Sequence, residues 1–432
     1  METKLARIAE IAKNRPEEVF TSLYHHINVE LLLECHRELD GNKAVGIDKV
    51  TKDEYQENIN ENIRDLVDRL KKHSYKPQPA KRVYIDKEKG KKRPLGIASY
   101  EDKIVQLALK KILEPIYEAD FLDISYGFRP GRSCHDALIV LNKCIERGKI
   151  NYIVDADIKG FFDHVDHKIL MEFISYRIAD TNIKRLIMRF LKAGIMENRE
   201  YVPSEEGTPQ GSIVSPLLAN IYLHYVLDIW FRDIVKVHCN GQSEIIRYAD
   251  DFVCCFEYER DAKRFYKSLI GRLAKYNLEV AEEKTKIIPF GPNSVANSAK
   301  MGMKKPGTFD FLGFNHRNGK SKAGRYRVKR KTSLKKFKAK VKDFKKWIRC
   351  MRHVDIKLIM IVVNAKLRGH YQYYGITDNY GMLNKYKHAV KRLLYKWLNR
   401  RSQRSSFNLE KFELFLKRYP LLNPRTYVSI YG

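Results

Sequence analysis

Residues 244–257 read Glu-Ile-Ile-Arg-Tyr-Ala-Asp-Asp-Phe-Val-Cys-Cys-Phe-Glu, so an acidic pair interrupts two apolar runs. Short apolar runs separated by a polar pair predict two strands joined by a tight turn. Asp250 and Asp251 would then lie at the tip of a hairpin. Because paired Asp residues favour turns for local reasons, this segment taken alone also fits an ordinary polar turn.

A second acidic strand is predicted upstream of this hairpin. Residues 150–158 read Ile-Asn-Tyr-Ile-Val-Asp-Ala-Asp-Ile, a pattern in which Ile153, Asp155 and Asp157 share one face. Asp157 and Asp250 are 93 residues apart (250 − 157), which does not matter if their strands lie side by side. We therefore expect carboxylates from both segments to meet at the end of one sheet.

Carboxylates in this arrangement suit the joining of nucleotides. Attack of a 3′-hydroxyl on a triphosphate needs two divalent cations, about 3.5–4 Å apart, that bridge the attacking and leaving oxygens. Mg²⁺ prefers a few carboxylates together with phosphate oxygens and water. Asp157, Asp250 and Asp251 are the candidate ligands.

Other metal-ligand patterns are weaker. The seven cysteines form no C-x-x-C pair, which argues against a zinc ribbon and a disulfide framework. His164 and His167 have metal-ligand spacing, but Asp163 and Asp166 fit better as caps of a helix over 167–174. Without a signal peptide or a run near 18 apolar residues, the sequence predicts a cytoplasmic protein with reduced thiols.

Net charge is the most informative bulk property. Lys and Arg total 82 against 52 Asp and Glu, which gives a net charge of +30. A protein so basic usually meets a polyanion, most often nucleic acid. Charge alone also fits a ribosomal or chromatin-type binder without catalysis, or attraction to anionic lipid. The length of 432 residues allows about two or three domains.

The pattern along the chain predicts helices at both ends and strands between them. Residues 1–75 look mostly helical, with Thr51 as a cap, and residues 81–97 predict a strand pair. After residue 320 basic residues dominate, yet apolar residues recur in steps of 3 and 4. The two stripes are Leu334, Phe337, Val341, Phe344 and Ile348, and Leu383, Tyr386, Val390, Leu393 and Trp397. With a further helix expected over 354–374, they predict a small bundle with basic outer faces.

The order of the longer motifs is far more specific than any one of them. Along the chain they are IDKEKGKKRPLGI at 85–97, SYGFRPGRS at 125–133, DADIKGFFDHVDH at 155–167, EGTPQGSIVSPLLANIYL at 206–223, RYADDF at 247–252, LEVAEEKTK at 278–286 and FDFLGF at 309–314. This series resembles the group II intron reverse transcriptases of the bacterial type over nearly the whole chain. The resemblance implies an α+β right-hand polymerase. Its parts would be an N-terminal extension and start of the fingers at 1–75, fingers and palm with an antiparallel sheet at 76–315, and an all-α thumb or maturase bundle with a basic tail at 316–432.

The same resemblance assigns catalytic roles. Asp157, Asp250 and Asp251 match the metal-binding carboxylates, which implies two Mg²⁺ ions, with Mn²⁺ as a substitute. Lys284 matches a basic residue near the leaving pyrophosphate that can serve as its proton donor, and Lys286 is the alternative.

Binding residues follow from the resemblance as well. Phe162 matches the bulky side chain that crowds the sugar 2′ position and excludes ribonucleotides; core packing beside Phe161 is the alternative. The other residues implied to bind the dNTP are Lys87, Arg93, Ile158 and Gln210. Those implied to hold the primer end are Phe311, Leu312, Gly313 and Phe314, for which a plain core strand is the alternative. RNA contacts are expected from Lys329, Arg330, Lys335, Lys338, Arg368, His370 and Tyr373, which mix basic and aromatic groups.

The leading functional hypothesis is an RNA-directed DNA polymerase that binds its intron RNA, assists splicing as a maturase and supports intron mobility. Its partners would be group II intron RNA or another structured RNA template, a DNA primer or target and dNTPs, with no membrane. One alternative is a domesticated relative in defence, repair or CRISPR adaptation, and another is a non-catalytic RNA-binding splicing chaperone. The intact aspartates and Gln210 weigh against the chaperone. With no cysteine after Cys350, a metal-stapled H-N-H nuclease is expected to be absent.

Overall fold

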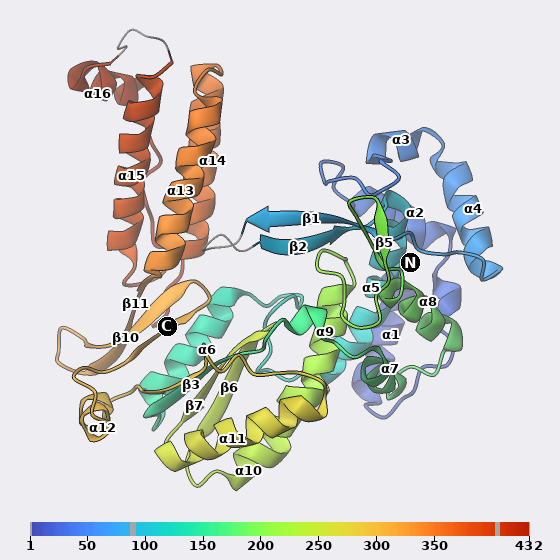
Figure 1. The fold of residues 1–432 in the computed structure, drawn as a ribbon, viewed down its shortest axis with the longest axis horizontal. Coiled ribbons are helices and arrows are strands. Elements are labelled where there is room, and N and C mark those ends of the chain that lie inside the picture. The colour runs from blue at the N-terminus through green and yellow to red at the C-terminus, as the bar shows by residue number, and fades with distance from the viewer. Residues whose placement is uncertain (1, 87–91, 402–406, 432) are drawn as a thin grey trace.

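The computed structural model describes residues 2–86, 92–401 and 407–431 (Figure 1). The N-terminal helices are α1 (Glu2–Asn14), α2 (Val29–Glu38), α3 (Lys52–Glu57), α4 (Ile59–Lys71) and α5 (Tyr100–Asp120). The central helices are α6 (Cys134–Arg147), α7 (His167–Ser175), α8 (Thr181–Leu191), α9 (Ser215–Leu223), α10 (Lys236–His238), α11 (Glu259–Lys275) and α12 (Ser294–Lys300), with π-helical turns η4 (His224–Asp228) and η5 (Phe231–Val235). The C-terminal helices are α13 (Leu334–Met351), α14 (Ile356–Tyr374), α15 (Tyr380–Leu398) and α16 (Leu409–Arg418). The predicted α+β class is confirmed.

The predicted N-terminal helices are present, and their caps explain where they begin. Thr51 accepts a hydrogen bond from the Glu54 N–H while the Glu54 side chain reaches back to the Thr51 N–H, a reciprocal cap at the start of α3. At the start of α2 the Asn28 side chain accepts a hydrogen bond from the Leu31 N–H at 3.0 Å. Helices α1 and α2 then pack against the long, largely buried α5.

A four-stranded sheet follows the N-terminal helices. The predicted strand pair is confirmed as β1 (Ala80–Asp86) and β2 (Lys92–Ile97), which pair antiparallel. Strands β4 (Ile195–Glu197) and β5 (Glu200–Val202) complete the order β2-β1-β4-β5, with β1 and β4 parallel. In Figure 1 the β1–β2 hairpin extends toward the C-terminal helices. Lys87, predicted to bind the nucleotide, lies outside the described residues.

The central sheet is antiparallel throughout. It consists of β3 (Tyr152–Asp157), β6 (Ser243–Tyr248), β7 (Asp251–Phe256) and β8 (Lys286–Pro289) in the order β6-β7-β3-β8. Alternate side chains enter two different apolar cores, because Val154 packs with the N-terminal and central helices and Ile153 packs toward the C-terminal half. By the same alternation, Asp155 and Asp157 lie on the face of Ile153, as predicted.

A third sheet occupies a segment that the sequence assigned partly to the helical domain. Strands β9 (Thr308–Phe311), β10 (Phe314–Lys320) and β11 (Tyr326–Thr332) form an antiparallel sheet in the order β11-β10-β9. Residues 316–332 are therefore mainly strand rather than helix. Every second side chain of β11 is buried, namely Val328, Arg330 and Thr332. This alternation is not evident in the sequence because most residues of the segment are basic.

The three long helices expected after residue 333 are confirmed as α13, α14 and α15. They run alongside one another in Figure 1, and α15 packs against both α13 and α14. The stripe on α15 is core-facing as predicted, whereas on α13 only Phe344 and Ile348 are buried and Leu334 is 57% exposed. Within the part of the chain that the structure describes, no helix is both long and apolar enough to cross a membrane.

Candidate functional site

Pairing between β3 and β7 brings the predicted carboxylates together. Asp157 lies directly opposite Asp251 in the register of these antiparallel strands. Residues opposite each other in such a pair have Cβ atoms about 4.5–5.5 Å apart. Asp250 belongs to the two-residue turn between Tyr248 and Asp251. The carboxylates of Asp157, Asp250 and Asp251 therefore meet where β3 ends and β7 begins. We call this end of the central sheet the carboxylate edge.

The turn that carries Asp250 has a constrained backbone. Ala249 has a φ of 58°, in the left-handed region that residues other than glycine rarely adopt. Gly127 lies directly behind it, and a Cβ at residue 127 would be 2.4 Å from the Ala249 backbone nitrogen. The glycine of the SYGFRPGRS motif thus allows the loop at 125–133 to support the acidic turn.

A buried arginine holds the same turn from inside the protein. Arg247 Nη1 donates to the Ala249 carbonyl oxygen at 3.0 Å and to Asn220 Oδ1 at 2.9 Å. Its Nε donates to Asp228 Oδ1 at 2.7 Å, and both charged side chains are fully buried. Asn220 Nδ2 in turn donates to the Gly127 carbonyl oxygen at 2.8 Å. The sequence does not predict this network, although an arginine in an otherwise apolar strand is a signal of it.

Asp228→Ala is expected to destabilise the protein by about 3–5 kcal/mol, because it leaves the Arg247 charge buried without its partner. The shift of the urea unfolding curve, followed by circular dichroism, measures this loss. Asp233→Ala breaks a solvent-exposed pair with Arg232 and is the control, with an expected loss of about 0–1 kcal/mol. Equal shifts for both variants would contradict a supporting role for the buried pair.

The clustered carboxylates repel one another. Burial first, and then the negative charges of three neighbouring aspartates, raise the pKa of Asp251 to about 7; the neighbours are Asp155, Asp250 and Asp157. Burial together with the charges of Asp310 and Asp157 likewise raises the pKa of Asp155 to about 7. The Asp251 residue nevertheless remains in contact with solvent. A bound cation would relieve the part of its pKa shift that comes from repulsion between the carboxylates.

Lys284 reaches the same edge of the sheet. Its Nζ forms an ion pair with Asp157 Oδ2. The Asp157 carbonyl oxygen accepts from the Ala281 N–H at 2.8 Å, and the Ala281 carbonyl oxygen accepts from the Lys284 N–H at 3.0 Å. Lys286, the alternative, lies in β8 opposite Asp155. The structure thus brings Lys284, and not Lys286, onto Asp157.

The oxygen donors suit a hard divalent cation such as Mg²⁺. The carboxylates are not arranged around a single ion position. In residues 2–86, 92–401 and 407–431, no three His, Cys, Asp or Glu side chains are grouped closely enough to hold a metal ion. The Lys284 ammonium group instead lies beside Asp157, where it partly neutralises the cluster. The mutual repulsion at Asp251 and the hard donor set both fit a bound cation.

The two histidines with metal-ligand spacing have other partners. His164 Nδ1 lies 3.3 Å from Glu206 Oε1, and His167 Nε2 donates to the Gly207 carbonyl oxygen at 2.7 Å. Asp166 caps α7 as predicted, whereas Asp163 ends a short 3₁₀ turn and caps no helix.

A cavity of about 400 Å³ lies next to the turn that follows β3. Phe162 and Gln210 both line it, as do Arg82, Tyr84 and Pro94 of the β1–β2 hairpin. Phe162 also packs edge-to-face on Phe161, with ring centroids 5.4 Å apart, so it contacts the core and the cavity at once.

Loop 206–211 forms one wall of this cavity and depends on its glycines. Gly207 and Gly211 have φ values of 81° and 108°. A Cβ on Gly211 would lie 2.6 Å from the Gly96 carbonyl oxygen, so only glycine allows the loop to approach β2 this closely. The Thr208 N–H also donates to the Phe162 carbonyl oxygen at 2.7 Å, which fixes the loop against the turn.

The basic residue that the structure brings to this cavity is one that the sequence interpretation missed. Arg82 lines it, and its Nε is buried without a hydrogen-bond partner. Arg93 instead lines a larger cavity on the side of the C-terminal helices. Ile158 is 3% exposed, so its side chain packs in the core and does not line this cavity. Strand alternation was the available signal, because Arg82 and Tyr84 are two residues apart in β1 and both line the cavity.

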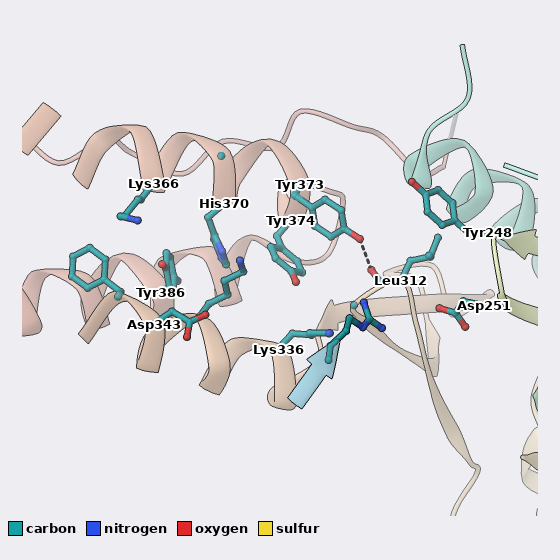
Figure 2. Close-up of a pocket in the computed structure, with 15 residues that line it drawn as sticks. Tyr248, Asp251, Leu312, Lys336, Asp343, Lys366, His370, Tyr373, Tyr374 and Tyr386 are labelled. Carbon is teal, nitrogen blue, oxygen red and sulfur yellow. Dashed lines mark hydrogen bonds between the residues drawn. The ribbon is translucent and has the colours of Figure 1, made fainter. Parts of the chain in front are cut away.

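The larger cavity, of about 870 Å³, lies between the carboxylate edge and the C-terminal helices (Figure 2). Asp251, Leu312 and Gly313 line one end of it. The rest of the lining includes the basic and aromatic residues Lys336, Lys340, Lys366, His370, Tyr373 and Tyr386, together with the acidic Asp343. Leu312 and Gly313 are the turn of the β9–β10 hairpin, and the flanking residues Phe311 and Phe314 are buried core residues.

The residues expected to contact RNA divide into exposed and interior groups. Lys335, Lys338, Arg368 and Tyr373 are exposed and Lys329 is half-buried. Arg330 is 0% exposed and its Nη2 donates to Asn142 Oδ1 at 2.8 Å. His370 is 7% exposed and stacks on Tyr386 with ring centroids 3.9 Å apart. Arg330 and His370 therefore differ from their predicted surface positions, because alternation in β11 and packing within the bundle turn them inward.

Comparisons with known proteins agree with this geometry. Residues 85–316 match the family described as reverse transcriptase (RNA-dependent DNA polymerase), and residues 334–415 match the group II intron, maturase-specific domain. The chain is 31% identical over 464 residues to the group II intron-encoded protein LtrA of Lactococcus lactis subsp. cremoris, covering 90% of this chain and 77% of LtrA. It is 41% identical over 189 residues to protein YkfC of Escherichia coli K12, covering 43% of this chain and 49% of YkfC.

An antiparallel sheet that presents carboxylates beside a basic helical bundle is the architecture of a template-directed nucleic-acid polymerase. The predicted right-hand fold is thereby confirmed. The chain belongs to the group II intron-encoded reverse transcriptase and maturase family. It is an RNA-directed DNA polymerase that uses an RNA template, and reverse transcriptases generally use divalent metal ions.

Proposed function

We propose that Asp157, Asp250 and Asp251 hold two Mg²⁺ ions and that Mn²⁺ can replace them. The observation that carries this proposal is the pairing of Asp157 directly across from Asp251. When bound, such ions would activate the attacking hydroxyl and stabilise the negative charge that develops in nucleotidyl transfer. Lys284 Nζ neutralises Asp157 in their absence and, in our proposal, turns to donate a proton to the leaving pyrophosphate.

The incoming dNTP, in this proposal, occupies the cavity lined by Phe162 and Gln210. The Phe162 ring lies against the sugar and leaves no room for a 2′-hydroxyl. Arg82, with its unpartnered Nε, contacts the triphosphate. Arg93 lines the larger cavity instead, so its proposed contact with the triphosphate, like that of Lys87, rests on the sequence resemblance. Gly207 and Gly211 let the backbone approach the base.

The polymer partners are proposed from charge and position. A DNA primer end rests on the turn formed by Leu312 and Gly313, at the mouth of the larger cavity. The template is group II intron RNA, whose phosphates contact the exposed Lys335, Lys338 and Arg368. The same RNA contacts support the maturase role, in which the protein stabilises the folded intron for splicing.

The experiment that tests the intron partner uses the Asp250→Ala/Asp251→Ala protein, expressed in the native host and recovered with its bound RNA. We expect one dominant structured RNA that spans the gene of the protein itself, because the two substitutions leave the exposed lysines that we propose to bind RNA unchanged. Sequencing of the recovered RNA gives the answer. Lys335→Glu/Lys338→Glu is the matched variant and should lose most of this RNA.

Two other outcomes would change the assignment. A broad mixture, or a small unrelated RNA, would favour a domesticated polymerase that serves defence, repair or CRISPR adaptation. Recovery of the intron RNA, together with no DNA synthesis by purified unaltered protein on a primed RNA template, would favour the splicing chaperone.

A further inference from the structure

The loop at 125–133 exposes an aromatic side chain to solvent. Phe128 is 56% exposed, and among the residues that the structure describes no other phenylalanine is exposed to this extent. Its φ of 59° lies in the left-handed region, which a bulky residue adopts only where the surrounding structure imposes it. An exposed apolar ring and a strained backbone both cost stability, which indicates a functional contact for Phe128.

The residue before Phe128 is fixed against the acidic turn. Gly127 lies so close to Ala249 that a side chain would not fit, and its carbonyl oxygen accepts from Asn220 Nδ2 at 2.8 Å. Asn220 is 1% exposed and also binds Arg247, so this anchor lies in the protein interior. The position of Phe128 relative to the acidic turn is therefore set by buried contacts.

The residue after Phe128 is buried as well. Arg129 is 6% exposed, and its Nη1 donates to the carbonyl oxygens of Leu122 at 2.7 Å and Ser125 at 2.9 Å. Its Nε donates to Glu118 Oε2 at 3.0 Å, which pairs the buried charge. With a fixed residue on each side, the loop holds the Phe128 backbone in its left-handed conformation and its ring in solvent.

The Phe128 ring lies next to Tyr248, the residue that precedes the acidic turn. The two ring centroids are 6.5 Å apart and the ring planes differ by 44°. Tyr248 lies opposite Asp251 in the register of β6 and β7, and both residues line the cavity of about 870 Å³. Figure 2 shows Tyr248 and Asp251 at the same end of that cavity. Phe128 is therefore separated from the carboxylate edge by one aromatic ring.

The chemistry of a phenyl ring selects the part of a nucleic acid that it can meet. The ring carries no charge and no hydrogen-bonding group, so it does not favour phosphate groups, which suit Lys and Arg instead. Bases and sugars offer apolar faces, and contacts between aromatic rings and bases tolerate any sequence. A polymerase must hold every primer end regardless of its sequence, so this tolerance fits the position of Phe128.

We propose that Phe128, together with Tyr248, forms an aromatic platform against which the bases or sugars of the last base pairs of the primer–template duplex pack. The inference rests on the proposed function, in which the primer end reaches the carboxylate edge. The platform adds affinity for a primed template over the same RNA without a primer, because a base pair lies at this position only when a primer is annealed. It also explains why an exposed, strained phenylalanine is held so firmly.

Phe128→Ala removes the ring. We expect the dissociation constant for a primed RNA template to rise about fivefold or more, the lower end of the effect of losing one aromatic contact with a base. For the same RNA without a primer, the constant should stay within about twofold, because the exposed lysines that we propose to bind RNA are unchanged. Fluorescence anisotropy without dNTP measures both constants. At saturating primed template, the rate of adding one dNTP should also stay within about twofold.

Tyr258→Ala is the matched control, because Tyr258 is an exposed aromatic residue at the other end of β7. It is 49% exposed and lies just after Phe256, the last residue of this strand, whereas Asp251 is the first. The control should leave both dissociation constants unchanged. Equal binding of the primed template by Phe128→Ala and the unaltered protein would overturn the proposal, and so would equal losses for primed and unprimed RNA.

Phe128→Gly separates binding from folding. Glycine adopts a left-handed backbone without strain, so the midpoint of thermal unfolding should be unchanged or higher. The affinity for the primed template should nevertheless fall as in Phe128→Ala, and this variant carries the binding test if Phe128→Ala does not fold. A lower midpoint would show that the ring serves the fold instead, which would overturn the proposal.

Photo-crosslinking identifies the contact directly. With p-benzoylphenylalanine in place of Phe128, irradiation of the complex with a primed template should attach the protein to nucleotides next to the primer end. Attachment spread over the whole template, or no attachment, would refute the platform. If the unaltered protein adds no nucleotide to a primed template, the proposed function fails. Normal addition together with an intact affinity in Phe128→Ala refutes the platform alone.

Discussion

Replacing Asp251 with asparagine is expected to reduce nucleotide addition by about 10³-fold or more. Asparagine keeps the size of the side chain but removes the charge that would hold a divalent cation, and such a cation contributes several kcal/mol to the transition state. Each 1.36 kcal/mol corresponds to about a factor of ten in rate. Rapid-quench addition of one dNTP to a primed RNA template measures the loss, and filter binding should show nearly unchanged RNA affinity.

Asp233→Asn is the control for this experiment. It removes one negative charge from an exposed residue of η5 and leaves the carboxylate edge intact, so its rate should match that of the unaltered protein. Residual addition by Asp251→Asn at more than a few per cent of the normal rate would contradict the assignment of Asp251 as a cation ligand. A fall in RNA affinity equal to the fall in rate would instead indicate a folding defect.

Phe162→Ala is expected to raise ribonucleotide incorporation about 10- to 200-fold relative to deoxyribonucleotide, the range that one altered apolar contact usually gives. The reason is steric, because the ring lines the proposed nucleotide cavity and its removal opens space for a 2′-hydroxyl. The ratio of kcat/KM for matched ribo- and deoxyribonucleoside triphosphates measures the change.

A graded series gives the control for Phe162. Phe162→Tyr keeps the ring and should retain sugar selectivity, and Phe162→Leu should fall between Phe162→Tyr and Phe162→Ala. Unchanged selectivity across the series would assign Phe162 to packing against Phe161 alone. The edge-to-face contact between the two rings makes a modest loss of stability expected in either case.

The carboxylate edge was predictable because its signals are local. Apolar runs around Asp157 and the acidic pair define short strands, and the two strands do pair side by side. The register that puts Asp157 opposite Asp251 depends on how distant segments pack, so no single stretch of sequence could supply it. The order of the motifs predicted the right-hand fold because each motif corresponds to one element of that fold.

The predictions failed where basic side chains are buried, because basic residues are usually expected at the surface. Strand β11 reads as a basic run, although Arg330 points inward to Asn142 and only its neighbours meet solvent. Arg82 was hidden among many basic residues, and strand alternation rather than composition brings it to the cavity. Arg247 and Tyr373 donate hydrogen bonds to backbone carbonyl oxygens, and no sequence pattern indicates such contacts.

The central sheet contributes to two apolar cores at once, since alternate residues of β3 and β7 enter opposite clusters. The second cluster is continuous from Ile153 and Val253 to Leu383 and Val390 of the bundle. Among the described residues, helix α6 and strand β9 pack against the central sheet, and the bundle joins the same cluster through the third sheet, where Phe314 contacts Tyr373 and Tyr374. A shortened chain that ended before α13 would expose apolar residues of the third sheet such as Phe314, and it would tend to aggregate although every carboxylate was still encoded.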